Sequence, residues 1–294
     1  MSHITVLLQE AIEGLSFEPD DIVVDATFGS GGHAVEILRQ LNSDGIYVGI
    51  DADNSAFAGT TLAKTKATVH LVNDNFQNIT EILRSLHIEK ADAILADLGW
   101  RMEQFTDGGK GFSFNVDEPL YMTFGDPKDY PFTAEDIINE WNEETLANIL
   151  YGYAEERFSR RIAKAIVTER KSLKISSTKQ LVEIVQSAVP KAYLHKKVHP
   201  ATKTFQALRI AVNDELGVLE RFIDESMNCL EVGGRLAIIT FHSIEDRIVK
   251  HTFRSLKEAG SGQLITKKPI CPSPEEMKNN PRSRSAKLRI IEKT

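Results

Sequence analysis

Cysteine is scarce in this chain of 294 residues: it occurs only at Cys229 and Cys271, which are far apart in the sequence. A disulfide framework needs more cysteines than this, and no group of Cys and His has the spacing of a zinc site. No apolar run approaches the about 20 residues of a membrane-spanning helix, and the first residues do not resemble a signal peptide. We therefore expect a cytoplasmic protein with no metal and no membrane partner.

Positive charge is also scarce over the chain as a whole. The formal net charge is −7, which argues against a general coat for nucleic acid. The exception is residues 151–210, which hold 13 Lys and Arg against 4 Asp and Glu. Such a segment is either a solvated helix surface or a face that binds a polyanion. The charge count leaves both interpretations open.

Strand and helix patterns alternate through the first hundred residues. Apolar runs that close on acidic residues predict strands at 21–27, 45–53, 67–74 and 91–99. Helical spacing separates the first strand from the second, and the third from the fourth. This alternation predicts a parallel sheet flanked by helices.

Helical periods then replace the strands. Residues 104–131 are predicted to form a long loop, helical patterns follow to about residue 190 and again at 203–230, and a strand pattern returns at 233–243. We expect an α/β Rossmann-like domain interrupted by an all-helical domain, which holds the basic excess. The predicted parts are 1–105, the first part of the α/β domain; 106–200, the loop and helical insertion; and 201–294, the completion of that domain with a basic C-terminal tail.

A glycine-rich turn, "DATFGSGGHA", follows the first predicted strand. It is not a P-loop, because it has no lysine at the required place. Its glycines, with Asp51 at the end of the second strand, suit the ribose of either NAD or S-adenosylmethionine. Asp25 favours S-adenosylmethionine, because a carboxylate repels a pyrophosphate but not a cationic amino-acid group. The alternative is a turn that only packs the strand against the helix.

Asp97 ends the fourth predicted strand, where open α/β sheets bind their ligands. A methyltransferase that acts on an exocyclic base amine needs a hydrogen-bond acceptor there, because the nitrogen lone pair is delocalised into the ring. Asp97 and the carbonyl of Leu98 are candidates for this acceptor. The alternative is that Asp97 merely caps the turn after the strand.

Several long motifs occur in a fixed order along the chain. They include "HITVLLQEAIEGL", "DATFGSGGH", "GIDAD", "EERFSRRIAKAIV", "HPATKTFQALRIAVNDEL", "GGRLAIITFHSIEDRIVK" and "NPRSRSAKLRI". Together they closely resemble the bacterial 16S rRNA cytosine-N4 methyltransferase family, also called MraW. The resemblance covers essentially the whole chain. It implies a class I methyltransferase fold with an inserted helical domain, and methyl transfer from S-adenosylmethionine to a cytosine of the decoding centre.

The resemblance also implies a set of cofactor contacts. These fall on Gly31, Gly32, His33, Asp51, Phe76, Asp97 and Gln104. The sequence departs from the family pattern at Arg101 and Met102, where a serine pair is usual, at Ser30, and within "PLYMTF" and "YAEER". The changes at Arg101, Met102 and "PLYMTF" concern the substrate mouth, so they leave the cofactor interpretation intact.

RNA contacts are predicted on basic side chains outside the glycine loop. The candidates are Lys203, Arg209, Arg282, Arg284 and Lys287. Lys203 and Arg209 have the alternative of simply forming a helix that closes the insertion. His242 is not assigned as a base, and "SIEDRIVK" is expected to be a helix with a serine cap.

The sequence therefore predicts an S-adenosylmethionine-dependent 16S rRNA cytosine-N4 methyltransferase whose partner is the small ribosomal subunit. One alternative is a methyltransferase that acts on an amine of DNA. Another is an rRNA-binding assembly factor that has lost turnover. Whether the protein forms a homodimer, and whether it acts on naked rRNA or on an assembled subunit, stays open.

Overall fold

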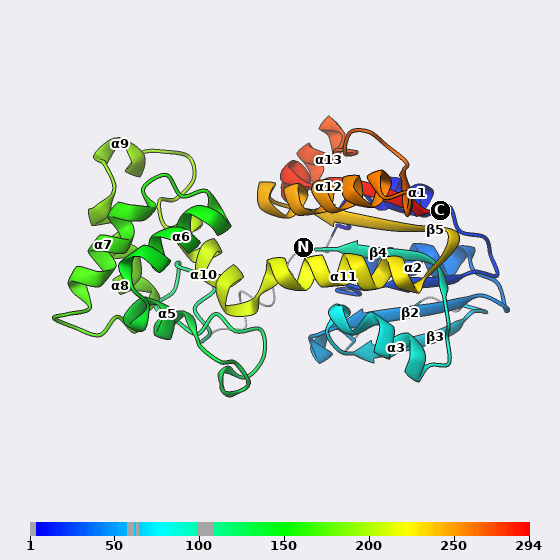
Figure 1. The fold of residues 1–294 in the computed structure, drawn as a ribbon, viewed down its shortest axis with the longest axis horizontal. Coiled ribbons are helices and arrows are strands. Elements are labelled where there is room, and N and C mark those ends of the chain that lie inside the picture. Colours follow the sequence, from blue (N-terminus) through cyan, green and yellow to red (C-terminus); the bar gives the residue numbers. More distant parts are fainter. Residues whose placement is uncertain (1–3, 58–61, 63–64, 99–108) are drawn as a thin grey trace. The chain divides into compact units, whose positions relative to one another are not determined.

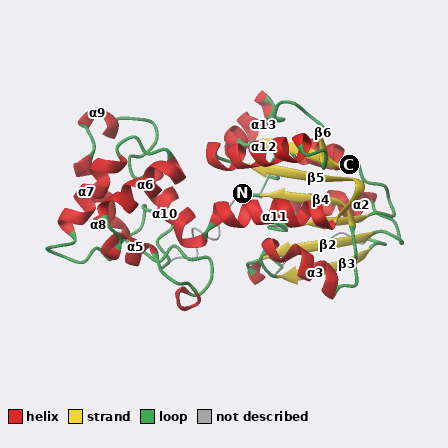
Figure 2. Cartoon of the chain, in the orientation of Figure 1, coloured by secondary structure: helices red, strands yellow, loops and turns green. Residues whose placement is uncertain are grey.

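The computed structural model describes residues 4–57, 62, 65–98 and 109–294. The chain forms two compact units. We call Met1–Trp100 with Leu216–Thr294 the sheet unit, and Arg101–Glu215 the helical unit. In Figure 2 the strands lie in the sheet unit, whereas the helical unit consists of helices and loops over its described residues. No helix within the described ranges is long and apolar enough to span a membrane.

The sheet unit is built on seven strands in the order β3-β2-β1-β4-β5-β7-β6. Figure 1 labels four of them, β2, β3, β4 and β5. The strands are β1 Ile22–Asp25, β2 Ile46–Asp51, β3 Thr68–Asn73, β4 Ala91–Asp97, β5 Leu230–Thr240, β6 Gly262–Leu264 and β7 Lys287–Lys293. Strands β1 to β5 pair in parallel, and β7 runs antiparallel to both β5 and β6. The α/β fold with a parallel sheet is confirmed.

Helices cover both faces of this sheet. The helices of the unit are α1 Leu8–Leu15, α2 Gly32–Gln40, α3 Ile79–Ser85, α11 Glu215–Cys229, α12 Ser243–Glu258 and α13 Pro274–Asn279. Apolar residues of α3, α11 and α12 pack on one face, around Phe222 and Phe253. Those of α1 and α2 pack on the other, around Leu15 and Ile37. Strands β1, β2 and β4 therefore read as continuous apolar runs, because they are buried on both sides.

The segment predicted as a basic tail is not a tail, because Lys287–Lys293 form β7, which lies between β5 and β6 in the sheet. Leu288 and Ile290 are buried, while Lys287 and Arg289 bond the carboxylate of Asp246 at 2.8 and 2.7 Å. Burial alone would raise the pKa of Asp246, but these two cations outweigh it and hold that pKa below its usual value. Two cations of the predicted tail, Lys287 and Arg289, are thus paired within the sheet unit.

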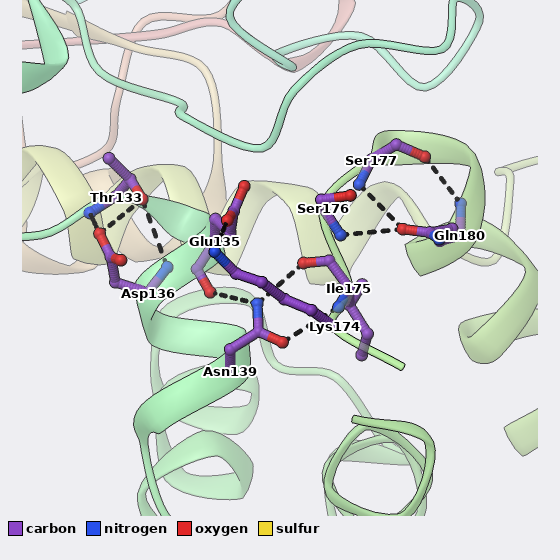
Figure 3. A network of polar contacts seen from close by, with 9 residues as sticks. All are labelled: Thr133, Glu135, Asp136, Asn139, Lys174, Ile175, Ser176, Ser177 and Gln180. Carbon is purple, nitrogen blue, oxygen red and sulfur yellow. Dashed lines mark hydrogen bonds and ion pairs between the residues drawn. The ribbon is translucent and has the colours of Figure 1, made fainter. Parts of the chain in front are cut away.

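The helical unit contains α5 Ala134–Glu140, α6 Glu143–Ala154, α7 Ser159–Glu169, α8 Thr178–Ala188, α9 Lys191–Leu194 and α10 Thr202–Asn213. They enclose a separate apolar core that also includes Leu120 and Met122 of the preceding loop. Ser177 caps α8 with Gln180 in a reciprocal pair. Figure 3 shows this cap beside Asn139, whose side chain exchanges two hydrogen bonds with the backbone of Ile175.

The helical pattern predicted over 203–230 is divided in the structure. Asp214 has φ 46°, so α10 ends before it and α11 begins after it. Asp is among the few residue types that adopt this left-handed conformation at modest cost. The helical unit consequently extends to Glu215, beyond the sequence boundary at residue 200.

Candidate active site

The predicted cofactor residues lie where neighbouring strands end. Strand β1 ends at Asp25, β2 at Asp51 and β4 at Asp97. Because β2 and β4 pair in parallel with β1 on its two sides, their carboxyl ends meet at one edge of the sheet. Ligands of open α/β sheets bind at such an edge. The structure therefore brings the two outer acids and the glycine loop together.

The glycine loop connects β1 to α2, and its conformation disfavours a side chain at each of its three glycines. Gly29 and Gly31 have φ of 56° and 75°, and the Gly31 N–H donates to the carbonyl of Phe28 at 2.9 Å. A Cβ atom on Gly32 would overlap Oγ1 of Thr5. Left-handed backbone is strained for other residues. At these glycine positions no side chain covers the backbone of the loop, which lies beside the strand ends.

Asp51 ties this loop to the second strand. Its Oδ2 accepts the Gly29 N–H at 2.8 Å, and its Oδ1 accepts the Asp53 N–H at 2.9 Å. A carboxylate is an acceptor-only group with two oxygens, which is the chemistry that binds hydroxyls. The position suits the ribose contact that the sequence predicts, and that contact stays a prediction.

Asp97 lies beside the start of α2 and is clamped to the first loop. Its side chain is 17% exposed, and its Oδ2 lies 3.9 Å from Nδ1 of the buried His33. Its backbone N–H donates to Oγ1 of Thr27 at 2.6 Å. The Thr27 hydroxyl thus joins the end of β4 to the loop after β1. This bond holds the backbone of Asp97 in place, and with it the point from which the side chain extends.

Asp25 lies beneath the loop and is only 1% exposed. Its oxygens accept the Thr27 N–H at 3.2 Å and the Tyr47 hydroxyl at 3.0 Å. Burial raises the pKa of Asp25 to about 6, against the lowering effect of these bonds and with a smaller raising effect from Asp51. Burial also raises the pKa of Tyr47, so its hydroxyl stays protonated and donates. Asp25 is too enclosed to contact a ligand, and it supports the loop from below.

Thr27 and Tyr47 did not emerge from the sequence as site residues. Their roles depend on β2 and β4 lying beside β1, which no local pattern specifies. The one available signal was chemical: a tyrosine in a buried strand needs a partner for its hydroxyl.

Phe76 opens the short turn after β3, close to the carboxyl edge of the sheet. The ring is half-buried and packs edge-to-face on Phe222 of α11, with centroids 4.9 Å apart and an interplanar angle of 79°. The aromatic core therefore orients this ring. Its predicted cover of an adenine face stays a prediction. Gln104, together with Arg101 and Met102, lies outside the described residues.

The predicted RNA contacts within α10 are engaged inside the helical unit. Lys203 donates through Nζ to the carbonyl of Glu155, at the end of α6, at 2.8 Å. Arg209 is 13% exposed and forms a two-pronged ion pair with Glu215, at 2.7 and 3.0 Å. These contacts match the alternative in which the two cations stabilise the helix that closes the insertion.

Two other predictions concern the segments around α12. Arg282 and Arg284 are exposed, whereas Lys287 is bound to Asp246. The expected serine cap of α12 is wrong: His242 is the cap, and its Nδ1 accepts the Glu245 N–H at 3.3 Å. Its extended backbone places the ring where a cap acts.

S-adenosylmethionine fits the residues at this edge. Residues 25–34 contain no Lys or Arg to bind a phosphate. Carboxylates at the ends of β2 and β4 suit ribose hydroxyls and a cationic amino group. The strand order, with β7 reversed between β5 and β6, is that of the class I S-adenosylmethionine-dependent methyltransferases, and this chain has that fold.

Comparison with known proteins identifies the family. The model of the MraW methylase family matches residues 1–294, and the chain belongs to this family. Among its relatives, the ribosomal RNA small subunit methyltransferase H of Symbiobacterium thermophilum is 44% identical, covering 99% of this chain and 96% of that protein. The protein of the same name from Clostridioides difficile is 41% identical, covering 99% and 98%. A solved rRNA methylase from Streptococcus thermophilus aligns over 99% of both chains with 13% identity and a TM-score of 0.46.

Proposed function

We propose that this protein transfers a methyl group from S-adenosylmethionine to the N4 amine of a decoding-centre cytosine in 16S rRNA. The observation that carries the proposal is Asp97, a largely buried carboxylate at the end of β4 beside the glycine loop. The relatives are named for methylation of small-subunit rRNA, and they align over nearly their whole length. An enzyme of bacterial ribosomes works in the cytoplasm, which is the location we propose.

The target amine needs activation because its lone pair is delocalised into the base. Asp97 and the carbonyl of Leu98 accept its two N–H groups, which lets the nitrogen become tetrahedral as it attacks. S-adenosylmethionine, when bound, supplies the methyl group on a cationic sulfur. Its sulfur would leave as a neutral thioether, and Asp97, which holds the amine N–H, or solvent would receive the proton that the amine loses. The protein contributes alignment of these atoms and a fixed acceptor.

The remaining residues of the site hold the cofactor in this proposal. Asp51 binds the ribose hydroxyls, and Phe76 covers the adenine. The glycine loop, with Gly31, Gly32 and His33, faces the amino-acid part, and Gln104 completes the contacts. Thr27 sets the position of Asp97 without touching either substrate.

The proposal is tested by methyl transfer to small subunits from cells that lack the mark. We expect transfer to these subunits, none to duplex DNA, and an N4-methylated cytidine in nucleosides from the treated rRNA by mass spectrometry. Transfer to DNA alone would establish the DNA methyltransferase instead. Cofactor binding with no transfer to naked rRNA or subunits would favour the assembly factor. Light scattering of the same samples decides whether the protein is a homodimer.

A further inference from the structure

The start of α7 and the segment around α9 carry exposed cations on aromatic rings. The guanidinium carbons of Arg157 and Arg161 lie 5.6 and 5.9 Å from the centroid of Phe158. Nζ of Lys196 lies 4.8 Å from the centroid of Tyr193. The two rings meet edge-to-face, with centroids 5.0 Å apart and an interplanar angle of 81°. We call these five residues the cation–aromatic surface.

A buried carboxylate holds the two rings together. Glu156 is 0% exposed; its Oε1 accepts the Phe158 N–H at 2.7 Å and its Oε2 accepts the Tyr193 hydroxyl at 3.1 Å. Burial, with Glu156 beside it, raises the pKa of Tyr193 to about 12, so the hydroxyl donates at neutral pH. The α9 segment is therefore pinned to the start of α7.

The three cations are held in place but not neutralised. Arg157, Arg161 and Lys196 are exposed, and none forms an ion pair with any residue of the described chain. Each lies within the about 6 Å at which a ring face attracts a cation. Their N–H donors therefore remain available to an anion. By contrast, Lys174 of the same unit is paired with Glu135.

Apolar side chains stand exposed in the same segment. Leu194 is 37% exposed and Val198 is 58% exposed, next to the cationic residues Lys196 and Lys197. A merely solvated charged face needs neither exposed apolar groups nor a ring scaffold. An unpaired RNA strand presents both phosphates for cations and base faces for flat or apolar groups. A duplex offers mainly phosphates, because its bases are stacked inside.

We propose that the cation–aromatic surface binds an unpaired strand of the RNA substrate, a proposal that rests on the proposed function in rRNA methylation. The flat guanidinium groups over Phe158 bind phosphates with two N–H donors each and offer a plane to a base. Lys196 adds a third positive charge beside Tyr193. The surface lies in the basic segment 151–210, but Lys203 and Arg209 of that segment are not part of it, because they bond within the helical unit.

The test compares two triple variants with equal loss of charge. R157A/R161A/K196A removes the surface, and K128A/K171A/K179A removes three exposed cations elsewhere in the helical unit. Binding of a labelled single-stranded oligoribonucleotide, and of its duplex, is measured over a salt series. We expect the first variant to weaken single-strand binding at least tenfold and to flatten the salt dependence by about 2 in slope, since each phosphate contact contributes about 0.7. The control should change affinity less than twofold.

A second variant separates geometry from charge. R157K/R161K keeps both charges but loses the flat guanidinium groups, so we expect the salt slope to persist while single-strand affinity falls about fivefold. Equal losses in both triple variants would overturn the proposal, as would equal binding of duplex and single strand or equal competition by polyglutamate. Methyl transfer to subunits distinguishes the two proposals: a wild type that methylates nothing refutes the function, whereas unchanged RNA affinity in the first variant refutes only the surface.

Discussion

The buried acids of the sheet unit and the exposed arginines at the start of α7 in the helical unit show two different uses of a charged side chain. In the sheet unit, Asp25 and Asp246 are enclosed and hydrogen-bonded, and their work is to hold loops and strands in place. In the helical unit, Arg157 and Arg161 are held by an aromatic ring yet remain exposed. What separates the two uses is whether the charged group itself is enclosed: Asp25 is bonded by Thr27 and Tyr47 and Asp246 by two cations, whereas the guanidinium groups of Arg157 and Arg161 stay exposed.

The largest effect is expected on the rate of methyl transfer, from a change at the largely buried Asp97. Asp97→Asn should keep stability near wild type but lower methyl transfer by about 10²–10³-fold, because an amide is a poor acceptor for the target amine. We also expect weaker cofactor binding, because the resemblance places Asp97 among the cofactor contacts. Single-turnover transfer at saturating cofactor is the measurement. Asp92→Asn is the matched control, because Asp92 lies on the same strand and binds the Ile22 N–H. Transfer near the wild-type rate would remove Asp97 from the chemistry.

A second large effect concerns pH and the enclosed Asp25. Its folded pKa of about 6 lies above the usual 3.8, so its contribution to stability is full below pH 3.8 and is lost as pH rises through 6. The loss is about 3 kcal/mol, because one pKa unit is about 1.4 kcal/mol. Relative to Asp25→Asn, the wild type should lose this amount of unfolding free energy between pH 4 and 7 in urea titrations.

The opposite dependence of stability on pH is expected for Asp246, which makes it a useful comparison with Asp25. The pKa of Asp246 is lowered, so its contribution is present above pH 3.8 and is lost as pH falls. Asp246→Asn should therefore cost the most stability at neutral pH. Parallel stability curves for wild type and Asp25→Asn would show that the Asp25 carboxyl does not titrate in the folded protein as described.

A somewhat smaller effect is expected for the cofactor. Asp51→Ala should weaken S-adenosylmethionine binding by about 2–3 kcal/mol, the scale of a charge-assisted hydrogen bond lost from a partly buried site. Calorimetry measures it, with Asp44→Ala as an exposed control on the loop before β2. NAD should show no comparable affinity. An unaltered calorimetric affinity would contradict the ribose assignment.

The smallest effect concerns the basic residues near β7. The exposed pair Arg282 and Arg284, changed to Ala, should weaken subunit binding by less than about 1 kcal/mol, as expected for exposed charges. Lys287→Ala should leave RNA binding unchanged and lower stability instead, because its partner is Asp246. If Lys287→Ala weakens RNA binding as much as the Arg282/Arg284 double variant does, the distinction between enclosed and exposed cations fails here.

The sequence predicted strands β1 to β4 because each is an apolar run that ends at an acid or is followed by one. It did not predict β7, whose Lys287 and Arg289 mask the alternation until Asp246 is placed beside them. The break at Asp214 was also invisible, because no glycine or proline marks it. Local sequence patterns predict helices and strands that form from local preferences. Strand β7 and the break at Asp214 were missed because they depend on contacts between residues that are distant in sequence.

The candidate site divides in the same way. Asp51 and Asp97 were found because a strand end is readable in the sequence. Thr27 and Tyr47 were not, because each acts across a strand boundary. The sequence shows the cation–aromatic surface only as a basic segment. Its geometry depends on the hydrogen bond between Tyr193 and Glu156, which are distant in sequence.

Strand β7 has a consequence for how the protein is made. It occupies an interior place in the sheet although it is the last strand in chain order, and α13 just before it holds the other end of the chain. Glu276 accepts the Leu7 N–H at 2.9 Å, and Asn280 donates to the carbonyl of Ile4 at 3.0 Å. Thr5, between them, is the residue against which Gly32 packs. During synthesis on a ribosome, the cofactor loop thus acquires its final packing only after the segment from α13 to β7 has emerged, so the nascent chain has no assembled methyltransferase site.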